Sequence, residues 1–90
     1  MKYQAPEDIT WKNLKTGIVL LNLSSGEYYT LNDTAAEIWR HAIEGEEKEA
    51  IIGYMTETYK DVSADDLAQH VDESMDYFLT EKLLAPTEGQ

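Results

Sequence analysis

The sequence of 90 residues contains no cysteine, only two histidines and no long run of apolar residues. Without cysteine the chain can form no disulfide, thiolate nucleophile or thiolate metal site, which suits a reducing cytosol. The longest apolar run, Ile18 to Leu21, is far shorter than the about 20 residues that a membrane-spanning helix needs. The first residues lack the apolar core of a signal peptide, so the sequence predicts neither secretion nor membrane insertion.

Basic residues are also scarce. The chain has 18 acidic residues against 7 lysines and arginines, for a net charge of −11. Residues 1–36 carry a net charge of −1 and residues 37–90 carry −10. The second part repels polyanions, which argues against nucleic acid and anionic membranes as partners and favours a basic or neutral peptide or protein. Alternatively, the acidic residues serve only to keep a small domain in solution.

Candidate catalytic or metal-binding groups are few. His41 and His70 lie on different predicted helices, in no known ligand spacing, so both are expected to be ordinary surface or boundary residues. Asp72 and Asp76 are four residues apart and share a helix face, with Gln69 one turn before them. That face could be simply solvated, or it could form the rim of a peptide site. The sequence therefore predicts no enzyme activity, metal or cofactor.

Three segments have the composition of β-strands: residues 9–14, 18–23 and 27–31. The sequence predicts a turn at Gly17 and a three-residue hairpin loop at residues 24–26, with Gly26 in the left-handed conformation. This loop would pair Leu21 with Tyr29 and Val19 with Leu31. The predicted core face then holds Val19, Leu21, Leu23, Tyr29 and Leu31. Residues 1–8 are expected to form a loose arm.

Three amphipathic helices are predicted to follow. The first is capped by Asn32 or Asp33 and ends near residues 44–45, the second covers residues 46–59, and the third is capped by Ser63. Pro86 is expected to end the ordered part. The predicted buried stripes are Ala35, Ile38, Trp39 and Ala42 in the first helix, Ala50, Ile51, Tyr54 and Met55 in the second, and Leu67, Ala68, Val71, Met75, Phe78 and Leu79 in the third.

The order of elements predicts a single α+β domain over residues 1–90, with an ordered core at about residues 8–85. A winged-helix-like packing of a three-stranded antiparallel sheet and three helices is the simplest way to bury all the apolar faces. The meander places the third strand at a sheet edge. Trp11 and Trp39 are expected to be packing anchors. Because Tyr28 and Tyr29 are adjacent in a strand, one of them should face the core and the other solvent or a partner.

The segment around the predicted hairpin resembles the PqqD-like family, whose members recognise precursor peptides in pathways to ribosomally synthesised peptide natural products. The family pattern is L-x-S-G-x-Y-Y-x-L-N followed by x-T-A-A-x-I-W, and this sequence carries it as residues 23–32 and 33–39. The closing F-L-x-x-x-L-L, from Phe78 to Leu84, agrees as well. Residues 22–26 lack the proline of the members that serve pyrroloquinoline quinone biosynthesis, so the chain looks closer to stand-alone members of lasso peptide and similar pathways.

The resemblance implies a cytoplasmic, non-catalytic peptide chaperone, or RiPP recognition element. A leader peptide would add to the third strand as a further strand against the third helix, and the domain would present it to a radical SAM enzyme, a cyclodehydratase or a leader peptidase. The expected oligomeric state is a monomer or a dimer formed through the edge strand. The alternative is a winged-helix DNA-binding regulator, which the acidic third helix disfavours. The residues expected to bind the peptide are Glu27, Tyr28, Tyr29, Thr30, Leu31, Leu67, Gln69, Val71, Asp72, Met75 and Asp76.

Overall fold

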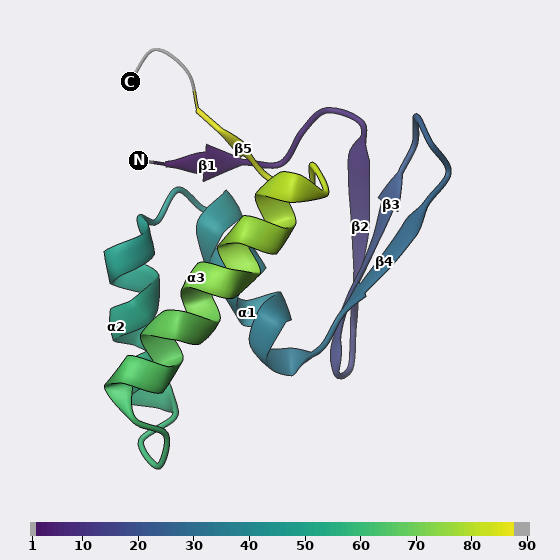
Figure 1. The fold of residues 1–90 in the computed structure, drawn as a ribbon. Helices are drawn as coiled ribbons and strands as arrows, with labels where there is room; N and C mark the ends of the chain where they lie inside the picture. Colours follow the sequence, from purple (N-terminus) through teal and green to yellow (C-terminus); the bar gives the residue numbers. More distant parts are fainter. Residues whose placement is uncertain (1, 88–90) are drawn as a thin grey trace.

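The computed structural model describes residues 2–87 as a sheet at one side of three helices (Figure 1). The elements are β1 Tyr3–Gln4, β2 Ile9–Leu14, β3 Gly17–Asn22, β4 Tyr28–Leu31, α1 Asp33–Ile43, α2 Lys48–Thr58, α3 Ala64–Thr80 and β5 Ala85–Pro86. Strands β2, β3 and β4 form the antiparallel meander, in that order. The predicted α+β, winged-helix-like class is therefore confirmed. None of the described helices has the length and apolarity to cross a membrane.

The two ends of the described chain pair with each other, which the sequence did not predict. Strand β1 lies antiparallel to β5, with Tyr3 opposite Pro86 and Gln4 opposite Ala85. The Thr87 N–H donates to the Lys2 carbonyl oxygen at 2.9 Å. The predicted loose arm thus contains a strand, and Pro86 belongs to one. A ladder of two residues has no periodic pattern, and its partners are separated by almost the whole chain.

The hairpin between β3 and β4 has a different register from the predicted one. Ile18 pairs with Leu31 and Leu21 with Tyr28, and the Asn22 N–H donates to the Glu27 carbonyl oxygen, so the four residues 23–26 form the loop. The Asn22 Oδ1 atom accepts hydrogen bonds from the N–H groups of Ser24 and Ser25, at 2.9 and 3.1 Å. The side chain of Asn22 thus closes the loop one residue earlier than predicted. Gly26 has the predicted positive φ, at 79°.

The shift of one residue exchanges the two faces of β3. Ile18 and Leu20 are fully buried and share the inner face with Leu31 and the half-buried Tyr29. The prediction that Val19, Leu21 and Leu23 face the core is wrong, since Val19 and Leu21 lie on the outer face and Leu23 in the loop is 62% exposed. The prediction for Tyr29 and Leu31 is confirmed.

The helix starts follow the predicted capping residues. The Asn32 Oδ1 atom accepts a hydrogen bond from the Ala35 N–H at 2.9 Å, and the Ser63 Oγ atom accepts one from the Asp66 N–H at 3.1 Å. These bonds satisfy N–H groups that have no partner within the helix. The predicted stripes are largely buried, but Ala50 is exposed and Tyr54 lies at the surface of α2.

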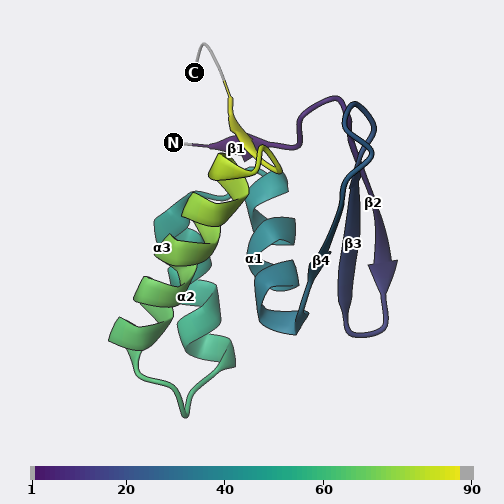
Figure 2. The same cartoon turned by 45° about the vertical axis from the view of Figure 1, so that its right-hand side comes forward.

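Helix α1 lies between the sheet and the other two helices (Figure 2). Its Trp39 is fully buried and donates from Nε1 to the Leu83 carbonyl oxygen at 3.0 Å. The Trp11 ring meets Trp39 edge to face, with centroids 4.9 Å apart. The prediction of a packing residue is confirmed for Trp39, whereas Trp11 packs on it but remains 41% exposed. Because α1 lies between α3 and the sheet, α3 packs on α1 and α2 and does not cover the face of the sheet.

Candidate functional site

Strand β4 is an edge of the sheet, as predicted, because among the described residues only β3 pairs with it. The Asn22 N–H donates to the Glu27 carbonyl oxygen at 2.9 Å, which fixes the pattern of the ladder. In an antiparallel pair, residues alternate between bonding to the partner strand and pointing away from it. Tyr29 and Leu31 therefore bond to β3, and the N–H and C=O groups of Tyr28 and Thr30 point outward from the edge.

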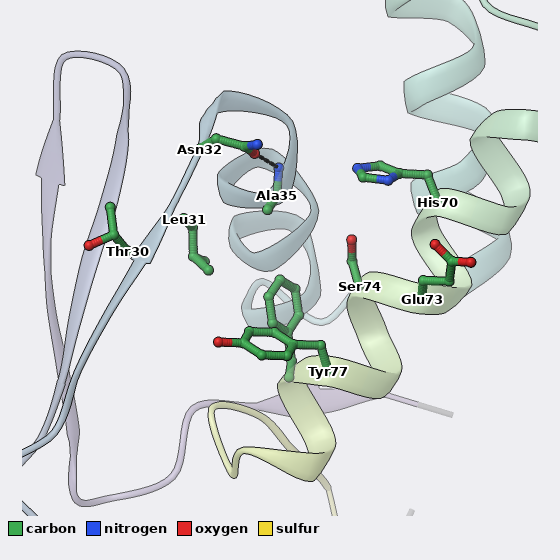
Figure 3. A pocket seen from close by; sticks show the side chains of 9 residues that line it. Thr30, Leu31, Asn32, Ala35, His70, Glu73, Ser74 and Tyr77 are labelled. Carbon is green, nitrogen blue, oxygen red and sulfur yellow. Dashed lines mark hydrogen bonds between the residues drawn. The ribbon is translucent and has the colours of Figure 1, made fainter.

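A hollow of about 360 Å³ lies between this edge and α3. Its residues come from β4, the start of α1 and one side of α3, and Figure 3 shows the α3 side chains opposite Thr30 and Leu31. The lining residues are Thr30, Leu31, Asn32, Ala35, His70, Glu73, Ser74, Tyr77 and Phe78. An extended chain bonded to β4 would place every second side chain toward this hollow.

The α3 side of the hollow is polar. The Nε2 atom of His70 is buried and has no hydrogen-bond partner among the described residues. Glu73, next along the wall, accepts a hydrogen bond from the Gln69 amide at 3.1 Å. Buried polar atoms in native proteins are nearly always hydrogen-bonded. The His70 imidazole therefore lies in the wall of the hollow with one buried nitrogen that lacks a partner among the described residues.

Tyr29 connects β4 to the end of α3. Its hydroxyl donates to the Glu27 carboxylate at 2.9 Å, and the Glu81 carboxylate lies 3.4 Å away. The hydrogen bond to Glu27, with desolvation and the negative charges of Glu27 and Glu81, raises the pKa of Tyr29 to about 12. The phenol thus stays protonated near neutral pH and holds two like-charged side chains beside the edge strand.

The structure brings together only some of the predicted site residues. Tyr28 and Thr30 lie at the edge, and Tyr29 and Leu31 face inward beside the hollow. On α3, three of the predicted residues are buried in the common core: Leu67, Val71 and Met75.

The polar site residues predicted on α3 lie outside the hollow lining. Asp72 is 2.7 Å from the Lys48 ammonium of α2, so it faces away from β4. Gln69 does not line the hollow, although its amide donates to the lining residue Glu73, and Asp76 is exposed. The predicted site also left out Asn32, Ala35 and Phe78, which line the hollow, and four further lining residues of α3: His70, Glu73, Ser74 and Tyr77. Their spacing of three and four residues was the available signal, since it marks one helix side next to the apolar stripe.

One group of possible metal ligands occurs among the described residues, around the end of α1. Ligand atoms of His41, Glu44 and Glu46 all lie within 4.8 Å of one another. The His41 Nδ1 atom is 2.7 Å from the Glu46 carboxylate, and the imidazole also stacks on Tyr54 with ring centroids 4.2 Å apart. These contacts explain why the three side chains lie close together: they connect the end of α1 to the following loop and to α2 at the surface.

Comparisons with known proteins identify a family and two structures of similar fold. The family model described as coenzyme PQQ synthesis protein D (PqqD) matches residues 17–84, so the chain belongs to this family. A solved structure described as TbiB1 in complex with the TbiA(β) leader peptide is 20% identical, with a TM-score of 0.84, over 96% of this chain and 99% of that chain. A second, lasso peptide synthetase B1 complexed with the leader peptide, is 26% identical, with a TM-score of 0.86, over 96% and 100%. No curated protein sequence matches the chain significantly.

Proposed function

We propose that this protein is a non-catalytic adaptor that binds the leader region of a ribosomally synthesised precursor peptide. The peptide adds to β4 as a further strand and fills the hollow against α3. The observation that carries this proposal is the outward direction of the Tyr28 and Thr30 backbone groups beside a hollow with polar and apolar walls. An edge strand supplies affinity through main-chain hydrogen bonds, and adjoining pockets supply sequence preference.

Family membership and the two similar structures support the proposal, because both structures hold leader peptides. The charge of α3 supports it over DNA binding. The helix contains five acidic residues and no lysine or arginine: Asp65, Asp66, Asp72, Glu73 and Asp76. A helix that enters the major groove of DNA carries basic side chains, so α3 would be repelled there.

The site follows from the edge and the hollow together. Its strand part is the predicted one, from Glu27 to Leu31. Its helix part moves from the buried stripe of α3 to the neighbouring side, because core residues cannot reach a peptide without unfolding the helix packing. The proposed helix residues are His70, Glu73, Ser74 and Tyr77.

The adaptor would act in the cytoplasm as a single domain and pass the bound leader to a modifying enzyme of the same pathway. A radical SAM enzyme, a cyclodehydratase and a leader peptidase are the candidate classes. The outward edge of β4 could also pair with the same edge of a second copy, so a peptide and an edge-strand dimer would compete for one surface.

Replacing Thr30 by proline tests the proposal. Proline removes an N–H that points outward, so the β3–β4 ladder keeps its bonds. The probe is a peptide selected on the wild-type protein from a phage-displayed library of random peptides about 15 residues long, enough to extend past both ends of β4. We expect Thr30→Pro to bind this peptide about tenfold more weakly, with a modest loss of stability.

The matched control is Thr30→Ala, which keeps the N–H and should leave affinity and stability nearly unchanged. Calorimetric titration gives the affinity, and thermal unfolding by circular dichroism gives the stability. A folded Thr30→Pro protein that binds the peptide as tightly as the wild type would contradict strand addition at β4.

A further inference from the structure

The outer face of the sheet carries apolar side chains next to the edge strand. Val19 and Leu21 of β3 point to this face because of the register, together with Tyr28 and Thr30 of β4. Tyr28 is 72% exposed, the largest exposed fraction among the large hydrophobic residues of the described chain. A second hollow, of about 240 Å³, lies on this face, lined by Thr10, Trp11, Lys12, Val19, Leu21 and Tyr28.

Val19, Leu21 and Tyr28 lie outside the hydrophobic core and are not packed against it. The helices cover only the inner face, where Ile18, Leu20 and Leu31 are buried. Solvent-facing strand positions are commonly polar in antiparallel sheets, which alternate apolar residues inside with polar residues outside. Apolar residues on the outer side, gathered beside an open edge, indicate a surface that another molecule covers.

The geometry of strand addition places part of the bound peptide on this outer face. Residues directly opposite each other in neighbouring strands have their side chains on the same face of the sheet. The peptide residues that lie directly opposite Tyr28 and Thr30, which are the bonded residues in an antiparallel pair, therefore place their side chains on the outer face, next to Tyr28 and Leu21. The residues between and beside them place theirs in the hollow against α3.

We infer that the outer face, at Val19, Leu21 and Tyr28, is a second recognition surface for apolar side chains at alternate positions of the bound peptide. The inference rests on the proposed function and extends it. The peptide is recognised on both sides of its strand: the α3 side offers the His70 imidazole and Glu73 carboxylate, and the outer side offers an aromatic ring and two aliphatic side chains. The peptide class is an extended segment with apolar residues two positions apart.

The test repeats the phage selection on three proteins: the wild type, the double variant Leu21→Thr/Tyr28→Thr, and the control Leu14→Thr. Threonine keeps the β-propensity of each position and removes the apolar surface. Leu14 is also exposed, at 43%, and lies on the same outer face, but it pairs with Gly17 at the far end of β2.

We expect peptides selected on the wild type and on Leu14→Thr to share apolar residues at two positions separated by one residue. This pattern should be lost from peptides selected on the double variant. A peptide selected on the wild-type protein should bind the double variant roughly tenfold more weakly than it binds the wild type. Substituting the two apolar residues of this peptide by serine should weaken its binding to the wild-type protein but not to the double variant.

An unchanged affinity of the double variant, together with weaker binding by Thr30→Pro, would overturn the second surface while leaving strand addition in place. The outer face would then belong to another partner, such as a second copy or a modifying enzyme. If Thr30→Pro also bound normally, strand addition and the second surface would both be wrong. Thermal unfolding checks each variant, and Tyr28→Thr alone repeats the test at an exposed position if the double variant does not fold.

Discussion

The two sides of α3 differ in what covers them. On the side toward α1 and α2, Leu67, Val71 and Met75 are buried in the common core. On the side toward β4, His70, Ser74 and Tyr77 line a hollow that α1 only partly fills. The first set recurs every four residues and the second at spacings of four and three, and both spacings are helical, so the helix alone does not distinguish the two sets.

The difference comes from the position of α3 in the fold. Helices α1 and α2 pack on one side, whereas the other side faces the edge strand β4 across the hollow (Figure 3). The outward N–H and C=O groups of an edge strand form a template for a further strand, whereas the backbone groups of a helix already bond to one another. The space between β4 and α3 is therefore suited to one more strand. The side of α3 toward α1 and α2 holds the domain together, and the side toward β4 is available to a peptide.

The largest expected effect is on the covered side. Replacing Met75 by alanine should lower the free energy of unfolding by about 2–5 kcal/mol, because it removes buried apolar atoms and leaves a cavity. This is a large part of the stability of a domain of this size. Chemical denaturation measures the change. The folded fraction should still bind the selected peptide with wild-type affinity, and specific weakening in folded protein would place Met75 in the site instead.

On the side of α3 toward β4, Tyr77→Ala should change stability little and weaken peptide binding strongly. The ring lines the hollow and is partly exposed, so its loss should change the free energy of unfolding by about 1 kcal/mol or less. Affinity for the selected peptide should fall by about 5- to 30-fold, as is typical for an aromatic residue within an interface. Calorimetric titration measures this loss. Equal affinity of Tyr77→Ala and wild type would show that the hollow stays empty in the complex.

A smaller effect is expected where Tyr29 connects β4 to α3. The pKa of Tyr29 is raised to about 12, chiefly by its hydrogen bond to Glu27. Because the folded-state pKa lies above the usual value of about 10, the stabilisation is complete below pH 10 and is lost as the pH rises toward 12. Nuclear magnetic resonance of labelled tyrosines gives the titration directly, with Tyr29→Phe to assign the signal. A midpoint near 10 for Tyr29 would mean that the hydrogen bond does not form.

The smallest effect is expected at the exposed acidic residues on the α2 side of α3. The Lys48–Asp72 pair is exposed on both sides, and such pairs contribute about 0–1 kcal/mol. The double variant Asp72→Asn/Asp76→Asn should therefore keep its melting temperature within a few degrees, and it should bind the selected peptide normally. The pKa of Lys48, which is raised chiefly by the hydrogen bond that its ammonium donates to the Asp72 carboxylate, should fall toward its ordinary value. Weaker peptide binding would extend the site onto this side.

The helices were predictable because their signals are local. Asn32 and Ser63 cap α1 and α3 as their positions in the sequence indicate. The register of β3 and β4 was not predictable, because Asn22 turns the chain one residue before the predicted loop. A shift of one residue exchanges the two faces of the strand. The pairing of β1 with β5 depends on residues more than 80 positions apart and has no local signal.

The candidate site was predictable where it depends on strand order. A meander leaves its last strand at an edge, so the residues from Glu27 to Leu31 follow from the sequence and the resemblance. The helix part was not predictable, because the rotation of α3 about its axis is set by packing on α1 and α2. That rotation places Val71 inward and His70 toward the hollow, although the two are adjacent in the sequence.

The most direct test of the central claim is a titration of ¹⁵N-labelled protein with the selected peptide, followed by amide chemical shifts and hydrogen exchange. Strand addition predicts that the amides of Tyr28 and Thr30 shift and become protected from exchange, and that shifts on α3 concentrate at His70, Ser74 and Tyr77. Shifts confined to residues 40–60, with the Tyr28 and Thr30 amides still exchanging freely, would contradict it.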